Sequence, residues 1–453
     1  MAFHSDTVTG ARAVMAALHE ILTNSSLLKA KSPSQVWQSL RHIPDNLKSV
    51  THNFLQENCD ARNIFNHEEG FYPQQEGVKF DAYMNTSTWM VIELYEAFAV
   101  KKMSFTFNSQ GDDRYYLMSF DLLGSNDGNN FTPIQTITLD RANVKGYSEF
   151  VINNNTSYKF YKFNNITSSS NSLVTKGWKM LDAQGVNRSN STYLFIVKGP
   201  GLANQDEIFV GYMHFKDSKT GENGFFIYGM TGYSATEPLL KQPGVCPRHV
   251  PSVPLWDGPT KYVISATGRR IFGTFKVSSN FNSFYAGFLL PYATPLQYPY
   301  PLFVGGQHCA YSKVKFSETG DYTMNYIRGS WGTSWGNGQG YASSGYVLDP
   351  AGTWQNICRW GESFYTLPIR LQSEPSNFKY ENVGGGYALE PVVVCRGNYL
   401  GSPAMLGELD GIQVVSGHGL AADSDGNING QRWMIFQDGY RNGINDFHVM
   451  KVE

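Results

Sequence analysis

The chain of 453 residues is poor in charged side chains, which make up 16% of it, against about 25% in an average soluble domain. Basic residues (36) and acidic residues (38) nearly cancel, and no basic or acidic tract interrupts that balance. A protein that binds nucleic acid or an anionic membrane through its charge needs a basic surface. We therefore expect neither nucleic acid nor a membrane surface among its partners.

Cysteines and long apolar runs are also scarce. The five cysteines are odd in number and far apart, so their spacing indicates neither a disulfide framework nor a metal knuckle. We expect reduced, mostly buried thiols and folding in a cytosol-like compartment. No apolar run approaches the roughly 20 residues that cross a bilayer, so we expect no membrane insertion. Near the N-terminus, Arg12, His19 and Glu20 interrupt the only candidate for a cleavable secretion signal, which we therefore do not expect.

The common enzyme signatures are missing as well, including G-x-S-x-G, the P-loop and H-E-x-x-H. The segment Asp423-Ser-Asp425-Gly-Asn427 begins like a calcium loop, but Met434 stands where that loop needs a bidentate glutamate. A hairpin turn is the better interpretation of this segment. We predict a protein that is not an enzyme and that has no cofactor and no bound metal.

Glycine (45 residues) and aromatic residues (14%) are abundant. From about residue 50 onward, short segments rich in β-branched and aromatic residues follow one another, with partial alternation of apolar and polar positions. Examples are Trp89–Tyr95, Val100–Phe107 and Tyr115–Ser125. Such segments are typical of antiparallel strands. We predict an all-β protein, mainly an antiparallel sandwich or jelly roll, with a short N-terminal helical arm.

Residues 1–50 are expected to form this helical arm. Thr7 or Thr9 is placed to cap a helix that runs to about Thr23, because apolar residues recur there at three- and four-residue spacing. A second helix is predicted over Ser34–Leu40. The arm is too small to bury its own apolar stripe, so we expect it to dock on the rest of the chain or on a neighbour. An ordinary packing helix is the alternative.

Residues 51–170 carry a characteristic order of strands. A tryptophan-led strand is followed by an F-x-F strand, by F-D-L-L-G-S-N-D-G-x-x-F with its Asp-Gly turn, and by a late aromatic strand ending Y-K-F. This order resembles the galactose-binding-like or discoidin jelly roll, and the resemblance implies that fold. It implies less about sugar binding, because the ligand loops of that family vary and many members mediate protein contacts. Residues 171–185 are polar and turn-rich, and we predict a linker there.

Residues 186–453 are expected to form a large β domain, either one domain or two subdomains with a break near 238–260, where prolines cluster. Within it, Phe284–Gly306 reads FYAGFLLPYATPLQYPYPLFVGG and has four prolines among aromatic and aliphatic residues. Proline disfavours a helix or a central strand, so we predict a stiff extended ribbon covered by its own domain and a neighbouring subunit. The candidate interface residues are Tyr292, Tyr298, Tyr300 and Phe303.

The same region carries a second resemblance. Ser252–Gly306 has an arginine pair before a strand and the element G-F-x-x-P-Y-x-x-P-x-Q-Y-P-Y-P-L, and a cadence of L-D-G, I-N-G and D-F closes the chain. These features are similar to a family of tailed-bacteriophage virion structural proteins. The resemblance implies a structural component of the virion, in the tail, baseplate or neck, assembled in the host cytoplasm. It also implies contacts with other virion proteins and a symmetric homo-oligomer.

A carbohydrate- or receptor-binding virion protein is the alternative function. Trp331, Trp335 and Tyr341 stand among glycines, and such rings suit stacking on the apolar face of a host surface glycan. Folding of the same rings onto the sheet or into a subunit contact is the competing interpretation. A capsid decoration protein and a polysaccharide-degrading enzyme are further alternatives, and the latter requires two facing carboxylates in a cleft.

Overall fold

The computed structural model divides the chain into two compact units. The small unit comprises Ile43–Leu194 and Lys216–Gly221, and the large unit comprises Met1–His42, Phe195–Phe215 and Glu222–Glu453. The structure describes residues 2–24, 26, 36–54, 56–57, 60–65, 80–83, 87–106, 117–139, 147–169, 172–175, 177–201, 207–217, 221–247, 251–292, 302–306, 308–309, 345–349, 352–357, 364–367, 387–396, 404–417, 419–437 and 447–452. Within these residues no helix is both long and apolar enough to span a membrane.

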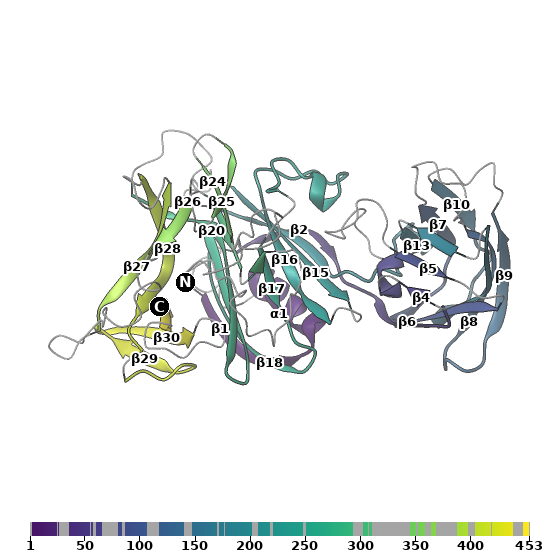
Figure 1. Cartoon of the computed structure of the whole chain (residues 1–453), viewed down its shortest axis with the longest axis horizontal. Helices are drawn as coiled ribbons and strands as arrows, with labels where there is room; N and C mark the ends of the chain where they lie inside the picture. The colour runs from purple at the N-terminus through teal and green to yellow at the C-terminus, as the bar shows by residue number, and fades with distance from the viewer. Residues whose placement is uncertain are drawn as a thin grey trace. The chain divides into compact units, whose positions relative to one another are not determined.

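The small unit is a jelly-roll sandwich of two antiparallel sheets, drawn mainly in blue in Figure 1. Its five-stranded sheet has the order β3-β6-β11-β8-β9, and its three-stranded sheet has the order β10-β7-β13. A separate small sheet joins β12, β5 and β4. The bounds are β3 Leu47–His52, β4 Gln56–Glu57, η2 Ala61–Phe65, β5 Phe80–Tyr83, β6 Thr88–Phe98, β7 Lys102–Thr106, β8 Leu117–Ser125, β9 Thr132–Thr138, β10 Tyr147–Val151, β11 Tyr158–Ser168, β12 Ser172–Thr175 and β13 Gly177–Leu181.

Alternation along these strands builds the core between the two sheets. In β6, Met90, Ile92 and Leu94 are buried, whereas the residues between them are half-buried on the opposite face. Trp178 of β13 is completely buried, and its ring contacts four phenylalanines that come from four other segments: Phe65, Phe105, Phe120 and Phe163. The predicted antiparallel sandwich is therefore confirmed.

The predicted linker over residues 171–185 belongs to the sandwich instead. It contains β12 and β13, and β13 pairs with β7 along its whole length, with Trp178 opposite Phe105. The segment is polar, so its composition does not indicate strands. The strands form because they pair with backbone partners about 70 residues or more away in the sequence, which a local pattern does not reveal. The small unit accordingly continues to Leu194.

The large unit contains three sheets, which we call the central, the β15 and the C-terminal sheets. The central sheet has the order β1-β18-β19-β20-β22-β24-β25, with bounds Ala2–Thr9, Pro259–Thr267, Arg270–Val277, Asn280–Phe288, Leu302–Gly305, Gly345–Leu348 and Trp354–Ile357. The β15 sheet has the order β2-β14-β15-β16-β17-β23, with bounds Gln38–Ile43, Leu194–Gly199, Ile208–Asp217, Glu222–Met230, Pro251–Pro254 and His308–Cys309. The C-terminal sheet has the order β26-β27-β28-β31-β30-β29, with bounds Phe364–Leu367, Leu389–Arg396, Ala404–Val415, Phe447–Lys451, Gln431–Gln437 and Asp425–Ile428, and β21 (Leu290–Pro291) also pairs with β28.

The central sheet is covered on both faces, as β20 shows. Phe284 contacts Tyr212 and Phe225 of the β15 sheet edge to face, while the next residue, Tyr285, packs in the core shared with the C-terminal sheet. On β19, Gly273 makes room for Phe284, because a Cβ there would lie 2.3 Å from that ring. Burial on both faces explains why β20 is an almost continuous run of buried residues rather than an alternating one.

The N-terminal segment differs in part from the predicted helical arm. The helix is confirmed as α1 (Ala11–Thr23), but its N-cap is Gly10, at φ +87°, rather than a threonine. The second predicted helix is wrong, since β2 is a strand of the β15 sheet. β1 pairs with β18 through all eight of its residues. Pairing with distant strands outweighs the weak local helical preference here.

The predicted proline-aromatic ribbon is also partly corrected. Its first residues belong to β20 and its last to β22, and these two strands are neighbours inside the central sheet. Between them, Leu290 and Pro291 pair with β28. Prolines 295, 299 and 301 lie outside the described residues. The clustered prolines near 238–260 do not separate two units, because this stretch falls within the large unit, where η4 (Leu239–Lys241) and β17 lie.

Candidate functional site

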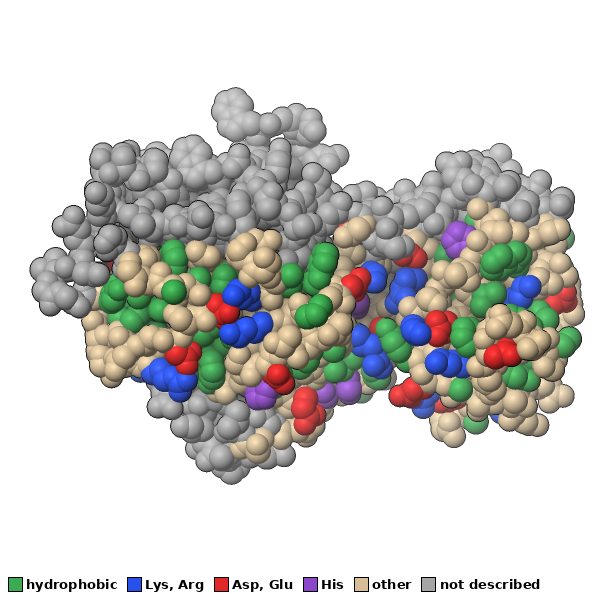
Figure 2. Space-filling view, turned by 90° about the horizontal axis from the view of Figure 1, so that it is seen from below, with side chains coloured by type: hydrophobic (Ala, Val, Ile, Leu, Met, Phe, Trp, Pro, Cys, Tyr) green, Lys and Arg blue, Asp and Glu red, His purple; other side chains and the backbone are tan. Residues whose placement is uncertain are grey.

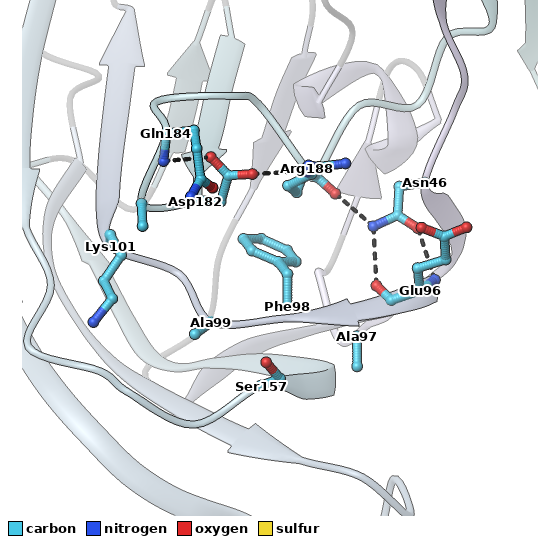
Figure 3. Close-up of a pocket in the computed structure, with 11 residues that line it drawn as sticks. Asn46, Glu96, Ala97, Phe98, Ala99, Lys101, Ser157, Asp182, Gln184 and Arg188 are labelled. Carbon is cyan, nitrogen blue, oxygen red and sulfur yellow. Dashed lines mark hydrogen bonds and ion pairs between the residues drawn. The ribbon is translucent and has the colours of Figure 1, made fainter.

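A pocket of about 350 Å³ opens in the small unit, where β6 ends, β7 begins and the chain turns after β13 (Figure 3). β6 positions the first wall. Its alternation of buried and half-buried residues stops after Leu94, so that Tyr95, Glu96 and Ala97 are all exposed before Phe98 returns to the core. Glu96 is thereby directed to the solvent beside a buried aromatic ring.

A tight turn after β13 forms the opposite wall. The carboxylate of Asp182 accepts hydrogen bonds from the backbone N–H groups of Gln184 (3.0 Å) and Val186 (2.9 Å). Gly185 adopts φ +76°, a conformation that glycine takes without steric cost. The turn returns the chain so that Nε of Arg188 donates to Asp182 at 2.7 Å.

Asn46 connects the two walls. Its side-chain oxygen accepts a hydrogen bond from the Glu96 N–H (2.7 Å), and its amide nitrogen donates to the Glu96 carbonyl (3.0 Å) and to the Arg188 carbonyl (2.9 Å). Figure 3 shows these bonds at one side of the pocket. Because the three bonds reach the backbone of both walls, Asn46 fixes the positions of Glu96 and Arg188 relative to each other.

Phe98 lies between the walls as an aromatic floor (Figure 3), with 8% of its surface exposed. Tyr161 of β11 holds the backbone beneath it, since its hydroxyl donates to the Phe98 carbonyl and accepts from the Val100 N–H. Burial raises the pKa of Tyr161 to about 12, so this hydroxyl keeps its proton across the physiological range. The floor is therefore fixed from inside the core.

The charges in the pocket balance. Glu96 and Asp182 face Lys101 and Arg188, whose amine and Nε are bonded to Asn155 and Asp182 respectively. Burial opposes ionisation of Asp182, but the bonds from Arg188 and the two turn N–H groups outweigh burial and lower its pKa. Asp182 thus stays ionised and committed to the turn, which leaves it unsuited to acid–base chemistry.

Several polar groups of the pocket remain available to a ligand. Within the described part of the chain, the Glu96 carboxylate, the Gln184 side-chain amide and the terminal nitrogens of Arg188 have no hydrogen-bond partner. The carboxylate provides acceptors, the guanidinium nitrogens provide donors, and the amide provides both, around the edge of the Phe98 ring. A small ligand with several hydroxyl groups satisfies such a set, because a hydroxyl both donates and accepts.

The residues predicted as sites from the sequence lie elsewhere. Tyr292 is 48% exposed and its hydroxyl donates to Glu408 at 3.0 Å. Phe303 is completely buried within its own unit, beside Tyr285, so its ring belongs to the core and does not face a second subunit. The remaining candidates, Tyr298, Tyr300, Trp331, Trp335 and Tyr341, lie outside the described residues.

The segment that begins like a calcium loop is engaged otherwise. Asp423 binds the amines of Lys261 and Lys276, both at 2.6 Å. Asp425 pairs with Arg432 across the β29–β30 hairpin. Within the described ranges, no three His, Cys, Asp or Glu side chains are grouped as metal ligands. β29 and β30 form a hairpin, but Asp425–Asn427 lie in its first strand, and the turn predicted for this segment is formed instead by Asn429 and Gly430, both at positive φ.

None of the pocket residues is predicted from the sequence. The two signals present were local ones: three successive exposed positions at the end of β6, and an Asp-Ala-Gln-Gly turn inside the supposed linker. Neither signal indicates that the two segments meet. The two segments meet through the side-chain bonds of Asn46, which comes from a third segment, and through the backbone bond from the Lys101 N–H to the Leu181 carbonyl.

Comparison with known proteins yields no family. No family model matches the sequence, and no curated protein matches it. Three similar solved structures are a pectin-binding carbohydrate-binding module (14% identity, 31% of this chain and 93% of that chain, TM-score 0.24), the lectin domain of lectinolysin complexed with Lewis B antigen (14%, 30% and 93%, 0.25) and the family 32 carbohydrate-binding module from C. perfringens NanJ in complex with galactose (10%, 29% and 90%, 0.24). At such TM-scores, the jelly-roll assignment rests on the strand order of the small unit itself. The resemblance to virion structural proteins stays a prediction.

Proposed function

We propose that the small unit is a carbohydrate-binding module and that an uncharged sugar binds in the pocket between Glu96 and Arg188. The observation that carries this proposal is the set of unpartnered polar groups, on two walls fixed by Asn46, around the edge of Phe98. A sugar offers the complement of that set, with hydroxyl groups at its rim and an apolar C–H face.

Charge favours an uncharged ligand in this pocket. The two acidic and two basic side chains around it cancel, so neither an anion nor a cation gains a net Coulomb attraction. Figure 2 shows the same pattern more widely, since basic and acidic side chains are interspersed on the visible face of each unit. Hydrogen bonds to the charged groups of the pocket then provide the affinity.

For the particle in which this module works, we retain the bacteriophage virion that the sequence resemblance implies. Among the expected roles, a virion protein that binds a host surface glycan fits a carbohydrate-binding module better than a purely structural component does. The virion itself is supported by the sequence resemblance alone. Mass spectrometry of purified particles tests that part separately from sugar binding.

A glycan array probed with the full chain, followed by calorimetric titration of the best neutral glycan, tests the proposed function. Glu96→Gln keeps the shape of the side chain and removes its charge, and we expect about tenfold weaker binding, because a hydrogen bond to a charged group contributes about 1.5 kcal/mol or more. Glu149→Gln is the matched control, since Glu149 pairs with Lys102 on the exposed three-stranded sheet. The proposal is wrong if no neutral glycan binds, or if Glu96→Gln binds as tightly as the unchanged protein.

A further inference from the structure

The outward face of the five-stranded sheet carries an apolar patch where a polar face is expected. On β11, Lys162 lies between two inward-facing core residues, so its side chain is directed outward. Its register partners are Val91 on β6 and Leu123 on β8, both half-buried. A lysine is thus flanked by aliphatic side chains on either side, on the face that turns away from the core.

Two aromatic rings complete this patch. The Lys162 amine lies 5.7 Å from the centroid of the Trp89 ring and 5.8 Å from that of Phe131. Trp89 comes from β6 and Phe131 from the residue before β9, so the two rings approach the amine from opposite sides of β11. Both rings are half-buried, which leaves part of each accessible. The amine is held in place by cation–π attraction.

The positive charge of Lys162 is not neutralised by its neighbours. The acidic residues beside Lys162 on the adjacent strands are Glu93, opposite Phe160, and Asp121, opposite Asn164, whereas Glu96, further along β6, lines the pocket. The Glu93 and Asp121 carboxylates both accept hydrogen bonds from other residues. Glu93 accepts from Lys48 (2.7 Å) and Ser49 (3.1 Å), and Asp121 accepts from Thr136 (2.6 Å) and Asn165 (2.9 Å). Across the described residues, no carboxylate forms an ion pair with Lys162.

We propose that Trp89, Phe131 and Lys162 form a second carbohydrate site, specific for an acidic sugar such as a uronic or sialic acid. The unpaired amine attracts the carboxylate of the sugar, while the accessible parts of the two rings accept its apolar face. The site goes beyond the pocket of the proposed function, which is charge-balanced and lies at the end of the sandwich rather than on its face.

The size of the patch favours a sugar over a protein partner. Hydrogen-bonded polar pairs border it, with Asp121 and Thr136 on one side and Glu93 and Lys48 on the other. A stable protein interface covers about 800 Å² on each partner. Two rings, two aliphatic side chains and one amine match a single sugar residue more closely.

Calorimetric titration of the full chain with matched ligand pairs tests the second site. The pairs are 3′-sialyllactose against lactose, and trigalacturonate against its methyl ester. We expect the acidic member of at least one pair to bind at least about tenfold more tightly than its neutral partner. Its affinity falls as salt rises from roughly 50 mM to roughly 500 mM, because an exposed ion pair is screened.

Variants locate the binding. Lys162→Met keeps the apolar stem and removes the charge, and we expect it to abolish the preference for the acidic sugar, whereas Lys179→Met on the other sheet leaves it unchanged. Phe131→Ala weakens the acidic sugar as well, and thermal melting confirms that each variant is folded. The second site is refuted if Lys162→Met retains the preference, if no acidic sugar binds, or if Glu96→Gln abolishes acidic-sugar binding. A loss of neutral-sugar binding in Glu96→Gln concerns only the pocket, so the two proposals fail separately.

Discussion

Replacing Asn46 by alanine separates the two walls of the pocket. The side chain makes three hydrogen bonds, one from the Glu96 N–H, one to the Glu96 carbonyl and one to the Arg188 carbonyl. The alanine variant loses all three, while the backbone bonds of residue 46 to Tyr95 and Asn190 remain. Asn46→Ala therefore tests whether fixed walls matter for sugar binding while the unpartnered polar groups of Glu96, Gln184 and Arg188 stay in place.

The expected magnitudes follow from the number of bonds. A typical hydrogen bond contributes about 1 kcal/mol net, so Asn46→Ala lowers the free energy of unfolding of the small unit by about 3 kcal/mol. For a domain of this size, each kcal/mol lowers the melting temperature by roughly 2–4 °C, which gives a decrease of roughly 6–12 °C. Loss of preorganisation weakens binding of the neutral sugar by about tenfold, because Glu96 and Arg188 must then be ordered by the ligand.

The chain offers a matched control for this variant. Asn53 also bridges to the backbone of its own unit, donating to the Ser87 carbonyl (2.9 Å) and accepting from the Trp89 N–H (2.7 Å), but it is not part of the pocket. Scanning calorimetry should show that both variants melt earlier, and titration should show that only Asn46→Ala weakens the neutral sugar. Equal loss of affinity in both variants, or unchanged affinity in Asn46→Ala, would show that Asn46 does not hold the walls for the sugar.

Three further predictions concern the acid response of the large unit and the hydrophobic cores of both units. Burial first, then the charge of His42, whose ring stacks 3.9 Å away, lower the pKa of His19 from 6.5 to about 4. The unfolded chain therefore binds the proton at higher pH than the folded chain. The contribution of His19 to the free energy of unfolding is thus present above pH 6.5 and falls by about 3 kcal/mol towards pH 4. Urea unfolding at several pH values should show that His19→Gln removes most of this loss. Trp178→Ala should destabilise the small unit by about 3–5 kcal/mol in calorimetry, because it leaves a cavity among four rings. Phe303→Ala should cost a similar amount in the large unit without changing the mass seen by sedimentation, whereas a lower mass would restore Phe303 to an interface.

Much of the small unit follows from sequence pattern. The predicted strand Trp89–Tyr95 lies within β6, and the predicted Val100–Phe107 contains β7, because these segments alternate visibly or are rich in β-branched and aromatic residues. β13 was missed although it carries the central tryptophan of the core. Its five residues are too few to show a period, and its pairing with β7 is set by contacts far away in the sequence.

The central sheet was hidden for a different reason. Proline in Phe284–Gly306 argued against central strands, but the ends of this segment enter the sheet where no proline stands. Burial on both faces removed the alternation by which a strand is usually recognised. The pattern of a single sequence reveals a strand with one buried face, because its apolar and polar residues alternate, but it reveals a strand with two buried faces poorly.

Neither candidate sugar site was predictable from the sequence. The pocket joins residue 46 to segments about 50 and 140 residues further on, through backbone bonds that have no sequence signature. The second site joins Trp89, Phe131 and Lys162 by strand register alone. The aromatic residues predicted as sugar platforms lie outside the described residues, and the grouping of Trp89 and Phe131 around Lys162 becomes visible only once the strands are aligned.

A crystal structure of the full chain with the best neutral glycan from the array shows directly whether the sugar binds in the pocket between Glu96 and Arg188. We expect density for one sugar ring in the pocket, with hydroxyl groups within hydrogen-bond distance of the Glu96 carboxylate and the Arg188 guanidinium and with the ring over the edge of Phe98. Density for the glycan at any other place on the chain, with the pocket empty, would contradict the proposed site.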